Sequence, residues 1–522
     1  MGFLLIIMTS MSFVSVYSAE GQNYLNESGI GPFGRRYLAL NRSLHAELRN
    51  MEMVMGQAND QKVIFRKFDK DWKVKCSTDG YEYICGIIRD HNGRYRMYYN
   101  VFQHVYNSEE KKTRRREAMA VAYSDDGVDW VRPALNIAPA IVDHPSSNLI
   151  NIEPHPGMNE KYYYRAGPVF FEEDAPEESR YKLSWRVGHN IYVATSSDGL
   201  NFITQGNAIN HKADTQHSAF YDPLRSKYVM YGRKRNDWET GPRDRRGVVL
   251  HSSENWTDVP WSNVGLVVID PMDVWDYSKQ VRPEVYTPSI QYYHGQYIGL
   301  PSIFFIDTTR HLVTDPDVNT GLYYPIVIYS HDGINWRFPD LNHSVIALEP
   351  HEHVSTYKQA SFKGKEPSTI TSAPNFIEID DRLLIYYTVR TGNYEEHRFD
   401  RDPGSINVAF MRVDGFASIR TKSSGSEPGE WVTSELQVPS GTESLRVNAK
   451  VHGSMQVEIL DPISGKPFNG LELARSVAVT GDKINFIMKW QDGAIDNVAG
   501  QSVRIRFVIV HGEIFSFSFQ PD

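Results

Sequence analysis

A short pattern that recurs five times constrains this chain more than any other feature of its sequence. An apolar, strand-like run leads into a polar turn with Asp-Gly, and an aromatic residue follows within a few positions. The pattern is clear at 120–130, 191–202 and 326–336, and it is degenerate at 248–256 and 407–416. Asp-Gly supplies the positive-φ residues of a tight hairpin turn, and the aromatic side chain can pack back across the strand pair. The repeat therefore predicts five β-hairpins.

The spacing of the copies predicts how the hairpins assemble. Intervals of about 55 to 80 residues leave room for four strands per copy. A further strand pair precedes each hairpin, at 83–99, 162–185, 218–231, 289–305 and 375–389. Units of this kind bury their faces only against neighbouring units, which favours a five-bladed β-propeller. A solenoid is the alternative, although its repeats would be more even.

The chain changes character after the last repeat. A linker-like run rich in Ser and Gly precedes alternating apolar runs such as 445–451 and 503–507, which predict a small antiparallel β-sandwich. Helical periodicity is nearly absent, and one short helix is expected within 35–57. The predicted fold is all-β, a five-bladed β-propeller followed by a small antiparallel β-sandwich. The predicted divisions are a signal peptide at 1–19, an N-terminal extension at 20–66, the propeller at 67–419, a linker at 420–429 and the sandwich at 430–522.

The start of the chain indicates export. An apolar stretch reaches small residues at Ser18 and Ala19, which is typical of a cleaved signal peptide, with a membrane anchor as the alternative. No later segment has the ~18 apolar residues of a membrane span, so no membrane insertion is expected after cleavage. Four Asn-x-Ser/Thr sequons fit a secreted, extracellular glycoprotein, and they begin at Asn26, Asn41, Asn255 and Asn342.

Charge and cysteine content narrow the chemistry. The formal net charge of -9 argues against nucleic acid and anionic membranes as partners. The two cysteines, Cys76 and Cys85, are expected to pair in an oxidising compartment, and two free buried thiols are the alternative. The sequence has no Gly-rich phosphate loop and no nucleophile or zinc motif. We therefore expect no cofactor and no metal site, while the oligomeric state is not specified.

Acidic residues near the start of predicted innermost strands are the candidate catalytic groups. Cleavage of a glycosidic bond needs paired carboxylates, one as proton donor and one as base or nucleophile. Asp79 offers a carboxylate in the first blade, Asp214 in the third and Glu284 in the fourth. The alternative for each is a turn residue or a strand-end charge.

Other polar and aromatic residues near the same strand ends are candidates for binding the substrate. Arginines bind carboxylate or sulfate groups of an anionic sugar well, and aromatic rings stack on sugars. The alternatives are surface salt bridges for the arginines and blade packing for the aromatics. The candidate substrate-binding residues are Arg186, Gln216, His217, Arg233, Tyr286, Arg390 and His397.

The hairpin repeat and the acid placement resemble the five-bladed glycoside hydrolases of the invertase-like and arabinanase/xylosidase-like families, in particular an uncharacterised branch with a C-terminal β-sandwich. The matching segments are 214–217, 221–223, 286–288, 300–302, 176–182, 453–461 and 465–467. The resemblance implies that Asp79 is the base, Asp214 a residue that modulates the pKa of the acid, and Glu284 the proton donor. The invertase Asn-Asp-Pro-Asn and Glu-Cys motifs are absent, which makes fructan cleavage unfavoured. The sialidase Asp box is one residue longer between Asp and Gly than the turns here.

These observations lead to two expectations about function. The first is a secreted glycoside hydrolase-like enzyme that acts on an extracellular polysaccharide or glycoprotein glycan, with anionic glycans favoured by the arginines. The second is a non-catalytic glycan-binding or extracellular-matrix protein on the same scaffold. They differ in whether Glu284 and a second carboxylate converge at a separation of ~5 to 9.5 Å.

Overall fold

The computed structural model of this chain describes most of the sequence, in thirteen segments. The described residues are 34–66, 80–107, 112–138, 147–156, 164–188, 190–210, 216–235, 246–275, 281–307, 321–347, 368–391, 404–422 and 427–521. These residues form mainly antiparallel β-sheets joined by turns, with short 3₁₀ segments as the helical elements within them. None of the helices in these ranges is long and apolar enough to span a membrane.

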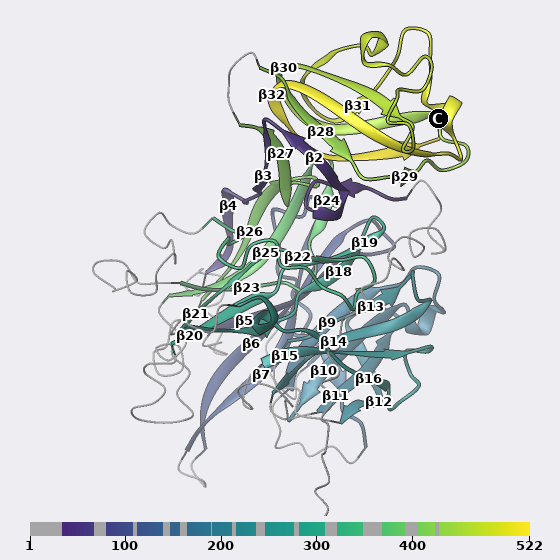
Figure 1. Cartoon of the computed structure of the whole chain (residues 1–522). Helices are drawn as coiled ribbons and strands as arrows, with labels where there is room; N and C mark the ends of the chain where they lie inside the picture. The colour runs from purple at the N-terminus through teal and green to yellow at the C-terminus, as the bar shows by residue number, and fades with distance from the viewer. Residues whose placement is uncertain are drawn as a thin grey trace, which may run out of the picture.

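The main body consists of consecutive groups of strands (Figure 1). The first group is β5 (Gly80–Arg89), β6 (Tyr95–Asn107) and β7 (Lys112–Ser124). The second is β8 (Asn151–Glu153), β9 (Tyr164–Phe171), β10 (Tyr181–Val187), β11 (Asn190–Ser196) and β12 (Asn201–Asn210), with η4 (Glu177–Ser179) between β9 and β10. The third is β13 (Ser218–Asp222), β14 (Lys227–Arg235), β15 (Arg246–Ser253) and β16 (Ser262–Ile269), followed by η5 (Pro271–Val274).

The fourth and fifth groups complete the body. The fourth group contains two three-stranded sheets whose strands interleave along the chain. One sheet is β17 (Val281–Thr287), β20 (Ser302–Asp307) and β21 (Gly321–Pro325), and the other is β18 (Ile290–Tyr293), β19 (Gln296–Gly299) and β22 (Ile328–Ser330). The fifth is β23 (Ser368–Ser372), β24 (Ile377–Ile379), β25 (Arg382–Thr391) and β26 (Ser405–Arg412), together with β4 (Asp60–Arg66) from the N-terminal segment.

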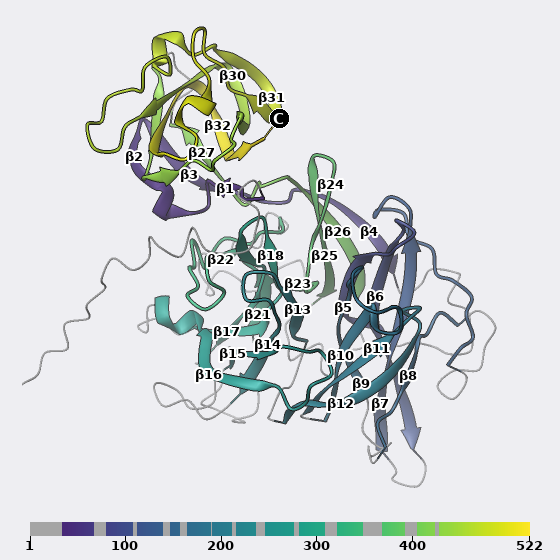
Figure 2. The ribbon, with the colours of Figure 1, turned by 90° about the vertical axis from the view of Figure 1, so that its right-hand side faces the viewer.

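Contacts between the groups close them into a ring. β5 lies against β9, β9 against β13, β15 against β17, β21 against β23, and β25 against β5. Figure 2 shows β5–β12 on one side of the body and β13–β22 on the other, with β23–β26 between them. The all-β, propeller-like class predicted from the repeat is confirmed, and the grouping agrees with five blades, although the exact blade count stays a prediction.

The N-terminal segment joins two parts of the molecule. β4 pairs antiparallel with β26, from Arg66 opposite Ser405 to Asp60 opposite Phe410, so residues 60–66 complete the fifth group. The expected start of the propeller at residue 67 is therefore too late. The short helix expected within 35–57 is a single 3₁₀ turn, η2 (Arg42–Leu44), and the rest of this range is mainly strand, with β1 (Tyr37–Leu38), β2 (His45–Arg49) and β3 (Met51–Met55).

β1–β3 belong to the C-terminal β-structure, at the top of Figure 1. This sandwich comprises them with β27 (Ala417–Thr421), β28 (Gly429–Thr433), β29 (Leu436–Gln437), β30 (Ser444–Leu460), β31 (Val479–Ile487) and β32 (Ser502–Gln520), and with η6 (Leu473–Arg475) and η7 (Ile495–Val498). β27 pairs with β3 and β32, so Ile419 lies in the sandwich and not at the end of the propeller. The expected linker at 420–429 is partly strand, since β27 ends and β28 begins within it.

The three clear copies of the repeat share one hydrogen-bonded turn. In the first, Ser124 Oγ accepts from Gly127 N at 2.8 Å, and Asp126 Oδ1 accepts from the backbone N–H of Val128 and of Asp129 at 2.8 Å. The turns at Ser196 and Ser330 repeat these bonds. Burial alone would raise the pKa of each turn aspartate, but the backbone donors outweigh it and lower the pKa. Only the glycine, and not the aspartate, has positive φ in these turns.

A tyrosine from the preceding group fastens each clear turn. Tyr386 Oη donates to Gly127 O at 2.6 Å, Tyr98 Oη to Gly199 O at 2.9 Å, and Tyr231 Oη to Gly333 O at 2.9 Å. The first of these contacts joins the fifth group to the first, so it helps to close the ring. We call this tyrosine–glycine hydrogen bond, present in all three turns, the tyrosine latch. It explains why each turn needs glycine, since a Cβ on Gly333 would lie 2.5 Å from the Tyr231 hydroxyl oxygen.

The latch yields a stability prediction. Replacing Gly333 by Ala is expected to lower the free energy of unfolding by about 2 to 4 kcal/mol, because the φ of +67° is strained for alanine and the new Cβ displaces Tyr231. Tyr231→Phe removes only the hydroxyl and should cost about 1 kcal/mol. Urea denaturation measures both effects. Gly465→Ala is the matched control, since Gly465 has a φ of +66° and a Cβ at this position would have nothing within 4 Å; an equal loss in this control would contradict the latch.

A charged cluster ties the ring to the sandwich. Arg36 forms two hydrogen bonds with the Glu378 carboxylate, from Nη1 to Oε2 at 2.8 Å and from Nη2 to Oε1 at 2.7 Å. Tyr293 Oη donates to Asp414 Oδ1 at 2.7 Å, and Ser516 Oγ of β32 donates to Asp414 Oδ2 at 2.5 Å. The N-terminal segment, the fourth and fifth groups and the sandwich therefore meet at one hydrogen-bonded junction.

Candidate functional site

Glu284 is the one predicted catalytic acid that the structure describes. It lies in β17, opposite Phe304 of β20, and its side chain is 0% exposed. Its Oε2 is 2.5 Å from Nη1 of Arg246, which begins β15 of the third group, and its Oε1 is 2.7 Å from Nη2 of Arg282 in β17. Because residues two apart in a strand share a face, Arg282 and Glu284 project together. Two arginines therefore hold the carboxylate at the boundary of the third and fourth groups. We call this arrangement of Arg246, Arg282 and Glu284 the clasp.

Tyrosines from opposite parts of the ring lie beside this carboxylate. The hydroxyl oxygens of Tyr83 in β5 and Tyr286 in β17 are 3.3 Å apart, although the fifth group separates their groups in the ring. The ring of Tyr286 stacks on Tyr323, with centroids 4.2 Å apart and an interplanar angle of 12°. Tyr83, Tyr286 and Tyr323 belong to one small buried cluster with Phe304. Two strands that do not adjoin therefore meet near the middle of the ring.

Arg233 joins the same cluster. Its guanidinium lies over the Tyr286 ring, 5.3 Å from the centroid, and its Nη1 donates to Tyr286 O at 3.0 Å. Arg233 is 5% exposed. Of the predicted binding residues, Arg233 and Tyr286 are thus the two that the structure brings together with Glu284.

Gln216 and His217 connect groups of strands. Gln216 Nε2 donates to Ile84 O of β5, and His217 Nε2 is 2.7 Å from Ser184 Oγ of β10. Both residues are buried. A Cβ on Gly167 would lie 2.4 Å from the His217 ring, so the imidazole is packed directly against the second group. These contacts hold the first three groups together, and any role of the two residues toward a substrate stays a prediction.

The remaining binding candidates lie elsewhere or outside the described residues. Arg186 is half-buried in β10, opposite Ile191 of β11, and the half-buried Arg390 lies with its guanidinium 5.2 Å from the Phe102 ring centroid. Trp185 and Tyr387, two other aromatics near strand ends, are fully buried in strand packing. His397 lies outside the described residues, as do Asp79 and Asp214, so their roles stay predictions.

Some of the predicted modification sites lie within the described residues, and others lie outside them. Asn41 is 4% exposed, and its Oδ1 accepts from Ser43 N at 3.1 Å and from Ser43 Oγ at 2.8 Å. Because a glycan cannot be attached to a buried amide, glycosylation at Asn41 does not fit this fold. Asn255 and Asn342 are exposed, and glycosylation at either stays a prediction. Asn26 and Cys76 lie outside the described residues, and Cys85 is buried, so the disulfide also stays a prediction.

Sequence reasoning missed several residues of the clasp and its surroundings, among them Arg282, Arg246 and Tyr323. Arg282 could have been found, because it lies two positions before Glu284 in a strand. Arg246 and Tyr323 carried no comparable signal, since each reaches the site from another strand. Among the described residues, no group of three or more His, Cys, Asp or Glu side chains is arranged to hold a metal ion.

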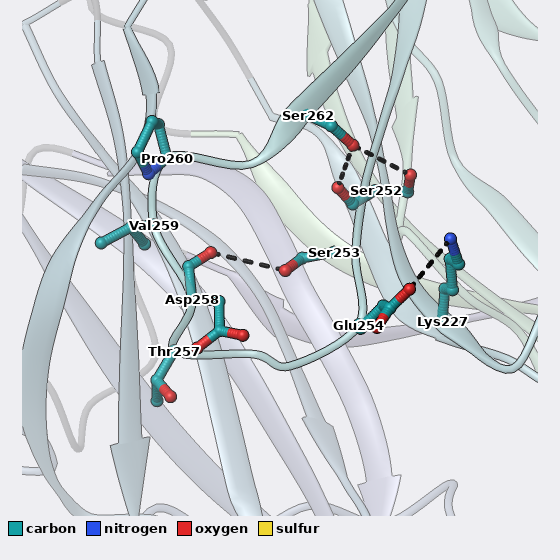
Figure 3. A pocket seen from close by; sticks show the side chains of 9 residues that line it. All are labelled: Lys227, Ser252, Ser253, Glu254, Thr257, Asp258, Val259, Pro260 and Ser262. Carbon is teal, nitrogen blue, oxygen red and sulfur yellow. Dashed lines mark hydrogen bonds and ion pairs between the residues drawn. The ribbon is translucent and has the colours of Figure 1, made fainter.

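A second feature, far less enclosed, lies in the third group of strands (Figure 3). This groove has a volume of about 640 Å³ and is lined by Lys227, Ser252, Glu254, Asp258 and Pro260, among others. Ser262 Oγ donates to Ser252 O at 2.8 Å, and Lys227 Nζ lies 3.5 Å from Glu254 Oε1. The groove is polar and does not include Glu284 or the tyrosine cluster.

Comparison with known proteins finds similarity at the level of solved structures. No family model matches the sequence, and no curated protein matches it. The chain is similar to a GH32 β-fructofuranosidase from Bombyx mori (11% identity, 85% of this chain and 92% of that chain, TM-score 0.38) and to an α-L-arabinofuranosidase from Clostridium thermocellum (11%, 62% and 92%, TM-score 0.30). It is also similar to a sialidase from Trypanosoma rangeli in complex with sialic acid (10%, 86% and 82%, TM-score 0.34). The solved structures that resemble this chain thus include glycoside hydrolases, and at these identities and TM-scores no residue role is transferred from them.

Proposed function

We propose that this protein is a secreted glycoside hydrolase-like enzyme that cleaves an extracellular, anionic polysaccharide. Glu284 is the proton donor, Asp79 the base, and Asp214 orients and tunes the donor. The observation that carries the proposal is the position of Glu284 on β17, beside tyrosines that reach the middle of the ring from two strands that do not adjoin.

The topology supports a converging set of acids. β5, β13 and β17 each begin a group of strands, and in a propeller the innermost strands start at the same end of the ring. Asp79 immediately precedes β5, and Asp214 precedes β13 by four positions. We therefore expect both acids at the end of the ring where Glu284 lies, since glycosidic cleavage needs paired carboxylates.

The arginines support an anionic substrate. Arg233, Arg246 and Arg282 gather around Glu284 and Tyr286, and guanidinium groups bind carboxylate and sulfate through paired hydrogen bonds.

The test is a reducing-sugar assay of the purified full chain on a panel of polysaccharides. The panel pairs each uronate-containing or sulfated polymer with a neutral polymer of similar linkage. The proposal expects new reducing ends from at least one anionic polymer, and Asp79→Asn and Asp214→Asn should each lower the rate. Glu435→Gln, a change at an exposed acid of the sandwich, serves as the control. Absence of cleavage across the panel would remove the enzymatic proposal.

A second function is favoured by the burial of Glu284. Its carboxylate is fully buried, with an arginine at each oxygen, which is the arrangement of a structural ion pair. On this basis the alternative is a non-catalytic glycan-binding or extracellular-matrix protein. Binding of an anionic polymer without any release of reducing ends, measured by calorimetry and the same assay, would support this alternative.

A further inference from the structure

The clasp around Glu284 is a ready-made site for an anion. Arg246 and Arg282 each contact a different oxygen of the same carboxylate, at 2.5 and 2.7 Å, from two strands in different groups. Arg246 Nη1 donates a hydrogen bond to one oxygen and Arg282 forms an ion pair with the other, so the two guanidinium groups present positive charge to both oxygens of a carboxylate or sulfate. Glu284 therefore occupies, with its own side chain, a position that suits the acidic group of a ligand.

We propose that Arg246 and Arg282 form an anion-binding site that Glu284 fills when substrate is absent, and that the carboxylate or sulfate of an acidic sugar displaces Glu284 from it. The displaced Glu284 carboxylate takes up a proton from solvent and then faces the bound sugar as the acid. The inference deepens the proposed function, because it names the residues that select the substrate class and links substrate binding to the release of the acid.

Exchange at this site is physically reasonable for an acidic ligand only. A sugar carboxylate offers Arg246 and Arg282 the oxygens that Glu284 offered, so both buried guanidiniums keep a charged partner. A neutral sugar in this position would supply no charge in exchange for that of Glu284, which is unfavourable beside two buried guanidiniums. The clasp should therefore discriminate between an acidic sugar and its neutral analogue.

The members of the clasp differ in exposure, and a third cation lies nearby. The Arg282 side chain is 13% exposed, compared with 5% for Arg246 and 0% for Glu284, so Arg282 is the most accessible member of the clasp. Arg233 lies at the adjoining Tyr286 ring. A sugar whose acidic group contacts Arg282 would thus have its ring near Tyr286.

The first experiment opens the clasp and measures small-anion binding. Glu284→Ala leaves the arginines and removes the carboxylate, so acetate or glucuronate should bind saturably in the millimolar range and raise the Tm by several degrees above a sodium chloride control. The double variant Glu284→Ala with Arg282→Gln should lose this response. A Tm of Glu284→Ala that changes with acetate no more than with chloride would overturn the proposal.

A second experiment uses the intact protein and does not depend on the folding of Glu284→Ala. An oligosaccharide with terminal glucuronate should bind wild type at least tenfold more tightly than its glucose-terminated analogue, and Arg282→Gln should abolish the difference. Equal affinity for the two ligands would overturn the proposal. Anion binding without hydrolysis would refute the proposed enzymatic function and leave the clasp intact. Hydrolysis of neutral and acidic polymers at equal rates would refute the clasp and the anionic substrate class, but would support the enzymatic activity itself.

Discussion

Glu284→Gln is expected to lower kcat/KM for polysaccharide cleavage by roughly 10²- to 10⁴-fold, the range that a positioned proton donor contributes. Glutamine keeps the shape of the side chain but cannot donate a proton to the glycosidic oxygen in the way that a carboxylic acid does. The measurement is the initial rate of reducing-end release on the polymer that the panel identifies. The rate should fall at every pH at which the wild type is active.

Glu284→Gln also disturbs a buried ion pair, so the control variant must disturb a buried ion pair away from the candidate site. Glu458→Gln meets this need, because Glu458 is 5% exposed in β30 of the sandwich and its Oε1 lies 2.6 Å from Arg506 Nη1. Both variants should unfold at a lower Tm than the wild type, but only Glu284→Gln should lose activity. Equal losses of activity in the two variants would show that Glu284 acts through stability alone.

Glu378→Gln is expected to lower the free energy of unfolding at neutral pH by about 2 to 3 kcal/mol and to flatten its dependence on pH under acid conditions. Burial alone would raise the pKa of Glu378, but hydrogen bonds from His294 and Arg36 outweigh it and lower the pKa to about 2. The carboxylate therefore stabilises the folded protein most when it is ionised.

The direction of the pH effect follows from this lowered pKa. The ordinary pKa of 4.5 applies in the unfolded chain and the value of about 2 in the folded one, so the contribution is complete above pH 4.5. It is lost as the pH falls toward 2, because the folded state then takes up a proton that breaks the pairing with Arg36. At the low end of this range, wild type and Glu378→Gln should have nearly the same stability.

Denaturant titrations at a series of pH values between these limits measure the difference. Glu435→Gln is the control, since Glu435 is exposed in the sandwich and should show the wild-type pH dependence. A constant difference between wild type and Glu378→Gln over the whole series would contradict the pKa assignment. Because Arg36 precedes β1 and Glu378 lies in β24, a loss of the pair should also loosen the sandwich from the ring.

The repeat could be predicted from the sequence because its structure is local. The Ser-Asp-Gly turn is complete within six residues, since Ser124 and Asp126 accept hydrogen bonds from N–H groups at most three positions away. No distant residue is needed to form it, so its signature survives in the sequence wherever the turn occurs. The degenerate copy at 248–256 lacks Asp-Gly, and there Trp256 Nε1 donates instead to Ala194 O of β11, a contact that the sequence pattern does not report.

The candidate site could be predicted only in part, for the opposite reason. Glu284 and Tyr286 stand out by their position before a predicted strand, and both lie in the cluster. Arg246 reaches the carboxylate from a different group of strands, 38 positions away in sequence, and Tyr83 meets Tyr286 from 203 positions away. Contacts over such separations depend on how the groups pack. The apolar and polar pattern of one strand does not indicate which side chains a neighbouring strand places beside it.

The amino-acid sequence alone is sufficient to establish that this chain is all-β, that hairpins recur along it, and that a second β-domain follows. These properties arise from turn chemistry and from the two-residue alternation of strands, which act within a few residues. Tertiary packing was needed to show that the N-terminal segment pairs with β26 in the ring and with β28 in the sandwich, that Asn41 is buried, and that two arginines clasp Glu284. The physical reason is that strand partners and ion pairs are chosen by the burial of the whole chain, in which segments more than 300 residues apart come to lie side by side.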